Sequence, residues 1–322
     1  MSVQIKDIFD IYFNNSMEFN ELIHLNKDDY LELKTYKGKE IIAYKKGFNK
    51  LKLLHRFLNE AVFNRIEIMN DVVFSYRKGV NVLNCVMPHR NSNFIFKTDI
   101  NNFFPSFSSE FIEVKLINKF NNFIISDINQ YLPEIVDIVT YNNTLPIGLS
   151  TSPSLSNILF SDIDFKIKLF SNENEYYYTR YADDIIISSN RDINKNTIFD
   201  DLQQILTSEN DNFILNKSKT KLLRKGNLRK IMGVCIMPDG HITVDKKLKN
   251  NIETKLYYMS KLNNIHSKDS ETTEIKRYLS GIINYVSTID NSYINKLKRK
   301  YGSTIVEMFI RKSLIKWNLN YQ

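Results

Sequence analysis

The chain has 322 residues, 43% of them hydrophobic, and a formal net charge of +8, which suits a globular protein of two or three subdomains. The absence of any run of 18 apolar residues and the charges within the first 20 residues argue against a membrane span or a secretory signal, so we expect a cytoplasmic protein with no membrane partner. Two cysteines, Cys85 and Cys235, are too few for a disulfide framework, and no Cys/His cluster has zinc spacing.

Helices and strands are expected to alternate along most of the chain. Residues 1–34 read as short helices and residues 35–50 as a hairpin. Apolar residues then recur at helical spacing in four stretches: 51–68, 107–123, 154–170 and 197–207. Strands between such helices predict an α+β fold with an antiparallel sheet backed by helices. A turn at 237–240 joins two further strand-like pieces, and from Lys246 onwards the pattern is almost wholly helical.

Lysine and arginine are concentrated towards the C-terminus. In residues 217–322 they outnumber aspartate and glutamate, whereas residues 1–216 carry an acidic excess. The segment 217–230 has seven basic residues and no acid, and residues 296–300 place further positive charge on one helix face. A nucleic-acid partner for the C-terminal part is the interpretation we favour over a solvated basic face.

The acidic pair Asp183-Asp184 is the most informative feature of the sequence. Aromatic residues are frequent in the preceding segment 176–181 and β-branched residues follow at 185–187, which predicts a hairpin with the pair at its turn. Adjacent carboxylates raise each other's pKa unless a cation neutralises them, and hard oxygen ligands of this kind suit Mg²⁺. Solvated turn acids are the alternative interpretation of the pair taken alone.

Two further segments give the acidic pair its context. Asp99 lies near the end of a predicted strand in which Phe94 and Phe96 alternate with polar residues. Two-metal phosphoryl transfer needs carboxylates that bridge two Mg²⁺ ions about 3.5–4 Å apart, and Asp99 with the hairpin pair would supply them. Between these segments, residues 145–159 combine a turn at Gly148 with a hydroxyl-rich helix start, where a template base or phosphate can approach closely.

The order of these three segments resembles motifs A, B and C of reverse transcriptases, and the flanking sequence resembles the bacterial retron group. The matching stretches are FKTDINNFFPSF, LPIGLSTSPSLSNILFSDID and YTRYADDIIISS. The likeness continues through the motif D segment at 216–220 to a thumb-like stretch at 277–285, and it covers roughly residues 35–302. It implies a right-hand polymerase fold, with fingers and palm in residues 1–230 and a basic, mostly helical, RNA- or duplex-binding thumb in residues 231–322.

The resemblance also implies roles for individual residues. Two Mg²⁺ ions, for which Mn²⁺ could substitute, would be held by Asp99, the carbonyl of Ile100, Asp183 and Asp184. Lys219 lies at the motif D lysine, which suits protonation of the leaving pyrophosphate, with a simple phosphate contact as the other interpretation. An aromatic ring at Phe104 would clash with a 2′-hydroxyl and so select deoxynucleotides, with plain core packing as the alternative.

Further positions are expected to contact nucleotide or RNA. The nucleotide-binding set is Lys37, Lys39, Phe104, Gly148, Ser152 and Pro153, of which the two lysines could equally be turn residues. The RNA-binding set is His89 with eight cations, namely Lys217, Lys221, Arg224, Lys225, Arg229, Lys230, Lys298 and Arg299. Arg180 is expected to be structural or to pair with a backbone phosphate.

The chain departs from the family pattern at three places. Ile147 stands where the family usually has a glutamine that contacts the incoming nucleotide, which puts nucleotide affinity and template dependence in question. The retron signature Asn-Ala-x-x-His keeps His89, with its asparagine displaced to Asn84 or replaced by Cys85. The Val-Thr-Gly signature keeps only Gly233. Because those segments are thought to read the cognate RNA, we infer a divergent RNA.

The resemblance implies an RNA-directed DNA polymerase of retron type. It would use dNTPs to copy part of a cognate structured noncoding RNA, prime from an internal 2′-hydroxyl and leave a branched RNA–DNA molecule (msDNA). Host RNase H would degrade the copied RNA, and an effector protein encoded nearby would link the enzyme to anti-phage defence. Two alternatives stay open: an abortive-infection-type reverse transcriptase that makes untemplated DNA, and a non-catalytic RNA-binding scaffold for an effector.

Overall fold

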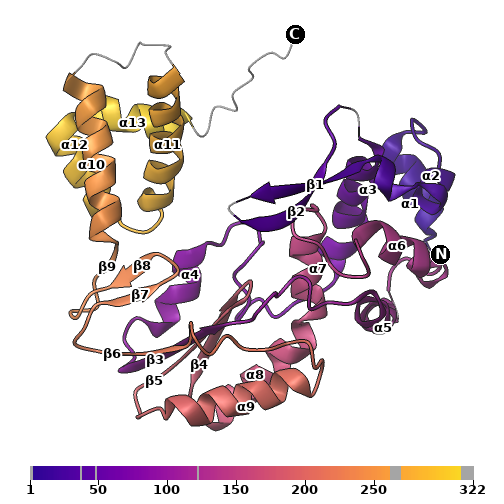
Figure 1. The fold of residues 1–322 in the computed structure, drawn as a ribbon, viewed down its shortest axis with the longest axis horizontal. Coiled ribbons are helices and arrows are strands. Elements are labelled where there is room, and N and C mark those ends of the chain that lie inside the picture. The colour runs from indigo at the N-terminus through magenta and orange to yellow at the C-terminus, as the bar shows by residue number, and fades with distance from the viewer. Residues whose placement is uncertain (1–2, 37, 48, 122, 262–269, 313–322) are drawn as a thin grey trace. The chain divides into compact units, whose positions relative to one another are not determined.

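The computed structural model describes residues 3–36, 38–47, 49–121, 123–261 and 270–312. By its internal contacts the chain divides into two compact units, one formed by Met1–Val80 with Phe96–Leu222 and the other by Asn81–Ile95 with Leu223–Gln322. Both combine helices with antiparallel strands, which confirms the α+β class (Figure 1). The division into fingers, palm and thumb at residue 230 stays a prediction.

The first unit contains eight α-helices among its described residues. They are α1 (Ile5–Phe13), α2 (Asn20–His24), α3 (Lys50–Phe57), α5 (Ser109–Phe120), α6 (Leu132–Val139), α7 (Ser152–Leu159), α8 (Ser161–Glu173) and α9 (Lys195–Thr207). Strands β1 (Leu31–Tyr36) and β2 (Lys39–Tyr44) form the predicted N-terminal hairpin. A four-stranded sheet has the order β4-β5-β3-β6, with β3 (Phe94–Asp99), β4 (Tyr177–Tyr181), β5 (Asp184–Ser189) and β6 (Lys221–Arg224).

Two of the long predicted helices are interrupted in the structure. The stretch 51–68 is helical only to Phe57, where a π-helical turn and then a short 3₁₀ turn replace the α-helix. The stretch 154–170 divides at Phe160 into α7 and α8. The ring of Phe160 is fully buried in the aromatic core, so the break between the two helices lies at a residue held by tertiary packing. Helical periodicity alone does not carry that information.

The core of the first unit contains an aromatic cluster that includes Phe103, four residues after the end of β3 at Asp99. Phe103, Phe107, Phe160 and Phe213 pack edge to face, with ring centroids 5.0–5.6 Å apart. Such aromatic pairs add about 0.5–1.5 kcal/mol each beyond the area that they bury. Helix α8 lies against β4 and α9 against α8, so helices back the sheet as predicted (Figure 1). The cluster therefore anchors both the strand end and the segment that follows it.

The second unit joins a small sheet to a helical bundle. Its elements are α4 (Val82–Val86), β7 (Arg229–Ile231), β8 (Val234–Ile236), β9 (Ile242–Val244), α10 (Lys246–Lys261), α11 (Ser270–Ser287), α12 (Asn291–Tyr301) and α13 (Ser303–Lys312). The strands pair antiparallel in the order β7-β8-β9. The buried Asp290 caps α12 by accepting a hydrogen bond from the backbone N–H of Tyr293 at 2.9 Å. The predicted helical character after Lys246 is confirmed for the described residues.

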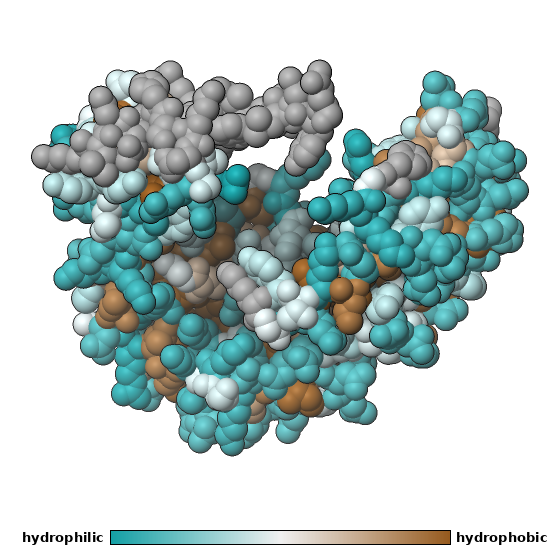
Figure 2. Space-filling view, turned by 45° about the horizontal axis from the view of Figure 1, so that its top comes forward, coloured by the Kyte–Doolittle hydropathy of each residue, from teal (hydrophilic) through white to brown (hydrophobic). Residues whose placement is uncertain are grey.

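No helix within the described part of the chain is long and apolar enough to cross a membrane. Figure 2 shows hydrophilic side chains over most of one face, with apolar side chains in smaller groups between them.

Candidate active site

The predicted hairpin places the acidic pair at its turn. Tyr181 pairs with Asp184 across β4 and β5, so Ala182 and Asp183 form a two-residue loop. Ala182 has a φ of +55°, the left-handed conformation that an L side chain adopts at a cost of about 1–2 kcal/mol. The surrounding structure must therefore hold this turn in place.

The end of β3 meets this turn and completes a group of three acids. The backbone N–H of Ile100 donates to the carbonyl of Asp183 at 3.2 Å, which fixes Asp99 beside the pair. Burial, and next the charge of Asp183, raises the pKa of Asp184 to about 6. Burial also raises the pKa of Asp183, and the charge of Asp99 acts in the same direction. The three carboxylates therefore share one electrostatic environment.

Lys219 partly neutralises this acidic group. Its Nζ lies 2.7 Å from Asp99 Oδ2, although the lysine side chain is 66% exposed. The motif D segment reaches the strand through the backbone N–H of Asn216, which donates to the Asp99 carbonyl at 2.8 Å. The hydroxyls of Thr98 and Thr220 add a buried contact at 2.7 Å. The proximity of Lys219 to Asp99 is thus a feature of the fold.

The carboxylate oxygens of these acids are ligand atoms of the type that binds a divalent cation. Asp99 is 6% exposed, and its Oδ1 is buried without a hydrogen-bond partner among the described residues. A buried carboxylate oxygen left unpaired is costly, and a hard cation is its natural partner. No three His, Cys, Asp or Glu side chains within the described ranges lie close enough together to form a preformed metal cluster. The residues therefore offer carboxylate oxygens as ligand atoms, but these oxygens do not form a preformed metal-binding cluster among the described residues.

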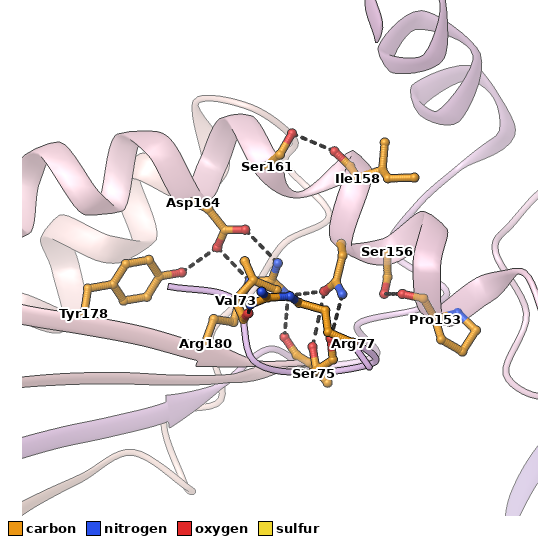
Figure 3. A network of polar contacts seen from close by, with 12 residues as sticks. Val73, Ser75, Arg77, Pro153, Ser156, Ile158, Ser161, Asp164, Tyr178 and Arg180 are labelled. Carbon is orange, nitrogen blue, oxygen red and sulfur yellow. Dashed lines mark hydrogen bonds and ion pairs between the residues drawn. The ribbon is translucent and has the colours of Figure 1, made fainter. Parts of the chain in front are cut away.

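A fully buried ion pair lies behind the turn. Figure 3 shows Asp164 of α8 facing Arg180 of β4. Arg180 donates from Nε to Asp164 Oδ1 at 2.7 Å and from Nη2 to Oδ2 at 2.6 Å, and neither side chain has any exposed surface. Tyr178 donates its hydroxyl to the same carboxylate at 2.7 Å. Since Arg180 is completely enclosed, its predicted alternative as a phosphate contact is wrong.

Arg180 also holds the turn from behind. Its Nη1 donates to the carbonyl of Ala182 at 3.0 Å and to Asn157 Oδ1 at 3.3 Å. The backbone N–H of Arg180 donates to the Val72 carbonyl at 2.7 Å, and the Arg180 carbonyl accepts from the Phe74 N–H at 3.0 Å. Sequence reasoning missed Asn157 and Asp164. An arginine in a strand with apolar neighbours is the signal that predicts a buried acid partner.

Phe104 and Phe103 have different surroundings. Phe103 is buried in the aromatic core, whereas Phe104 is half-buried and faces the ring of Tyr76 at a centroid distance of 6.4 Å. Phe104 is thus the more available of the two for contact with a substrate. Tyr76 was not singled out from the sequence.

The glycine turn of the second motif is fitted against β2. The Ile42 N–H donates to the carbonyl of Ile147 at 2.8 Å. A Cβ on Gly148 would lie 2.1 Å from the Ile42 carbonyl oxygen, and its φ of +115° is strained for any other residue. Tyr44 adds a second connection, since its hydroxyl accepts from the Ser150 N–H at 2.9 Å. The turn and the N-terminal hairpin are therefore joined at two points.

The remaining nucleotide-set residues differ in exposure. Ser152 is buried and donates its hydroxyl to the Pro146 carbonyl at 2.6 Å, so it shapes the turn from within. Pro153 is half-buried at the start of α7. Lys39 is exposed on β2, and its charge lowers the pKa of Asp183 against the effect of burial. Lys37 lies outside the described residues.

The RNA-binding set includes two buried side chains, a result that does not favour their direct contact with RNA. His89 is fully enclosed, and burial lowers its pKa to about 3. Arg229 is also fully enclosed and donates to the carbonyls of Ser92 and Arg90 at 2.5 and 2.9 Å. Both therefore support the fold of the second unit. The exposed members are Lys217, Lys221, Arg224, Lys225, Lys230 and Arg299, and Lys298 is half-buried beside Glu307.

Comparison with known proteins agrees with the motif order. Residues 43–276 match the family described as reverse transcriptase (RNA-dependent DNA polymerase). The chain is similar to the retron Ec86 reverse transcriptase of Escherichia coli, with 28% identity over 70% of this chain and 68% of that protein. It is also 28% identical to the Escherichia coli retron Ec73 reverse transcriptase, over 82% of this chain and 86% of that one.

Among solved structures, the chain is similar to a telomerase from Candida albicans, with a TM-score of 0.45 and 14% identity. The match covers 80% of this chain and 47% of the telomerase chain. Family members generally use divalent metal ions, for which the acids described above supply suitable ligands. The resemblance to retron enzymes is confirmed by the curated relatives. The chain therefore belongs to the reverse transcriptase family and is an RNA-directed DNA polymerase.

Proposed function

We propose that this reverse transcriptase is of retron type and copies part of a cognate structured noncoding RNA into DNA. It primes from an internal 2′-hydroxyl of that RNA and leaves a branched msDNA in the cytoplasm. Two curated relatives that match over most of their own length are named as retron reverse transcriptases, which supports the type.

The observation that carries the chemical part of the proposal is the unpaired Oδ1 of Asp99 beside the acidic turn. With Asp183, Asp184 and the carbonyl of Ile100, this oxygen would complete the ligands for two divalent cations, Mg²⁺ or Mn²⁺. When bound, such ions lower the pKa of a primer hydroxyl and neutralise charge on the nucleotide phosphates. Binding of such cations would explain why three acids that repel one another lie in one site and why one of their buried oxygens has no hydrogen-bond partner.

The neighbouring residues bind and orient the nucleotide in this proposal. Lys219 is exposed and held at Asp99, so a competing cation there would release its ammonium group to meet the pyrophosphate as a proton donor. Phe104 excludes the 2′-hydroxyl of a ribonucleotide. Lys37 and Lys39 contact the triphosphate, and Gly148, Ser152 and Pro153 shape the floor on which the nucleotide and template base rest.

The exposed cations of the RNA-binding set, concentrated in 217–230, would bind the noncoding RNA and its DNA copy through their phosphates. Host RNase H would remove the copied RNA, and an effector protein encoded nearby would complete an anti-phage system. One feature supports an untemplated polymerase of the abortive-infection type instead, namely Ile147 in place of the usual glutamine.

The test is to sequence the nucleic acid that co-purifies with the protein expressed from its native locus, after RNase, DNase and 2′,5′-debranching treatments in parallel. One abundant short DNA, released from one short RNA by debranching, is the expected result. An Asp183→Asn/Asp184→Asn variant purified in parallel should carry the RNA without the DNA. DNA of unrelated sequence, or DNA attached to protein, would favour untemplated synthesis. RNA without any DNA in the preparation of the unmodified protein would favour a non-catalytic RNA-binding scaffold.

A further inference from the structure

Tyr76 is an aromatic residue held in an unfavourable backbone conformation at the edge of the site. Its φ is +57°, and the residue is 47% exposed, while the preceding Ser75 is completely buried. A bulky side chain rarely adopts the left-handed region unless its surroundings impose it. Such strained positions cluster at functional sites, which makes the residue a candidate for a role in binding.

The loop around Tyr76 is fixed on both sides. Before it, the N–H of Phe74 donates to the Arg180 carbonyl at 3.0 Å, and Asn157 Nδ2 donates to the Ser75 carbonyl at 2.9 Å. After it, Arg77 Nη1 donates to the Asn70 carbonyl at 2.8 Å. Figure 3 shows Ser75 and Arg77 within this network beside Arg180. The network that supports the acidic turn therefore also presents Tyr76.

The Tyr76 ring neighbours Phe104, with the two ring centroids 6.4 Å apart. Phe103 also neighbours Phe104, at a centroid distance of 5.5 Å, and belongs to the buried core. Tyr76 also lines a cavity of about 1080 Å³ together with Pro153 and Asn157. If the Tyr76 ring were removed, Phe104 would have space to turn away from its position.

The acidic turn lies close to the same ring. Burial, and next the charge of Asp183, raises the pKa of Tyr76 to about 12. The phenol is therefore neutral at ordinary pH and presents an uncharged ring to its neighbours. The ring therefore lies near both Phe104 and the acidic turn, where the proposed function places the nucleotide sugar.

We propose that Tyr76 is a specificity-determining residue that holds Phe104 in the orientation that excludes a 2′-hydroxyl. The inference rests on the proposed function, in which Phe104 selects deoxynucleotides. Tyr76 acts through Phe104, so the two rings work as a unit. An aromatic contact of this kind corresponds to about a 2- to 12-fold effect.

Tyr76→Gly is the informative variant because glycine adopts a positive φ without strain and removes the whole ring. The measurement is the ratio of incorporation efficiencies for a dNTP and the matching rNTP, in single turnovers on a primed RNA template. It compares the unmodified protein, Tyr76→Gly, Phe104→Ala, the double variant and Tyr177→Ala, whose exposed ring lies on β4. Melting temperatures show whether each variant is folded.

We expect Tyr76→Gly to melt no lower than the unmodified protein and to lose discrimination by about 2- to 12-fold. Phe104→Ala should lose about 10- to 200-fold. The double variant should match Phe104→Ala, and Tyr177→Ala should leave the ratio unchanged. If Phe104→Ala relaxes selection while Tyr76→Gly leaves the ratio unchanged, or lowers both rates equally, the inference about Tyr76 is wrong and the proposed function stands. If the unmodified protein does not prefer dNTPs, both fail.

Discussion

Replacing Asp164 by asparagine is expected to destabilise the first unit strongly. The substitution keeps the shape of the side chain and removes its charge, which leaves the Arg180 guanidinium buried without a counter-charge. Both residues are fully enclosed, so water cannot compensate. Breaking a buried ion pair from one side costs about 3–5 kcal/mol in the free energy of unfolding.

The hydrogen bonds of the structure lead to the same magnitude. Arg180 makes two bonds to the Asp164 carboxylate, at 2.6 and 2.7 Å, and a bond to a charged group contributes about 1.5–3 kcal/mol. The Tyr178 hydroxyl bonds the same carboxylate at 2.7 Å and would lose its charged acceptor. A loss near the upper end of the range is therefore expected.

The measurement is urea unfolding followed by circular dichroism. A matched control is Glu32→Gln, which removes an acid from the exposed pair with Lys34 and should change the stability by less than about 0.5 kcal/mol. The double variant Arg180→Met/Asp164→Leu should recover most of the loss, because an apolar pair can replace a buried ion pair. Its DNA synthesis should still be at least about 10-fold slower than that of the unmodified protein, because the Ala182 carbonyl has lost the hydrogen bond from Arg180.

Two results would refute this reasoning. A loss below about 1 kcal/mol in Asp164→Asn would mean that the enclosed pair does not stabilise the unit. DNA synthesis at the unmodified rate in the double variant would mean that Arg180 does not position the acidic turn.

Three further predictions follow from single residues. Gly148→Ala should lower the free energy of unfolding in urea by about 2–4 kcal/mol, since its Cβ would meet the Ile42 carbonyl. The control Gly226→Ala, whose Cβ has open space, should lower it by about 1 kcal/mol. Equal losses would contradict the close packing of Gly148 against β2. Burial lowers the pKa of His55 from 6.5 to about 4, so its contribution to stability is present above pH 6.5 and is lost as the pH falls. The stability that the protein loses in urea unfolding between pH 7 and pH 5 should therefore differ by about 1–2 kcal/mol between the unmodified protein and His55→Phe, and an equal loss in both would contradict the assignment. Lys219→Ala should slow DNA synthesis about 100-fold with little change in melting temperature; an unmodified rate would exclude it as the proton donor.

The sequence was sufficient where the signal is local. Strand-forming residues on both sides of Asp183-Asp184 predicted the hairpin, and the structure has it with the acids at the turn. The strand ending at Asp99 was predicted from alternating apolar residues, and it is confirmed as β3. These features depend on neighbours in the chain, which is why pattern and motif order could locate them.

Features that depend on distant neighbours could not be read in this way. The partner of Arg180 comes from α8, and nothing in the local pattern distinguishes Asp164 from a surface acid. His89 was placed at an RNA surface by motif likeness, yet packing in the second unit encloses it. Tyr76 gained its significance only from a backbone conformation and a ring contact that the structure revealed.

The most direct test of the central claim is single-turnover DNA synthesis by the purified chain on a primed RNA template, compared with an Asp99→Asn variant. Primer–template affinity and melting temperature are measured on both proteins. We expect the unmodified protein to extend the primer with the templated dNTP. We expect Asp99→Asn, folded and still binding the primer–template, to be slower by a factor of about 1000 or more. Extension by Asp99→Asn at a rate near that of the unmodified protein would contradict the assignment of the acidic group as the catalytic centre.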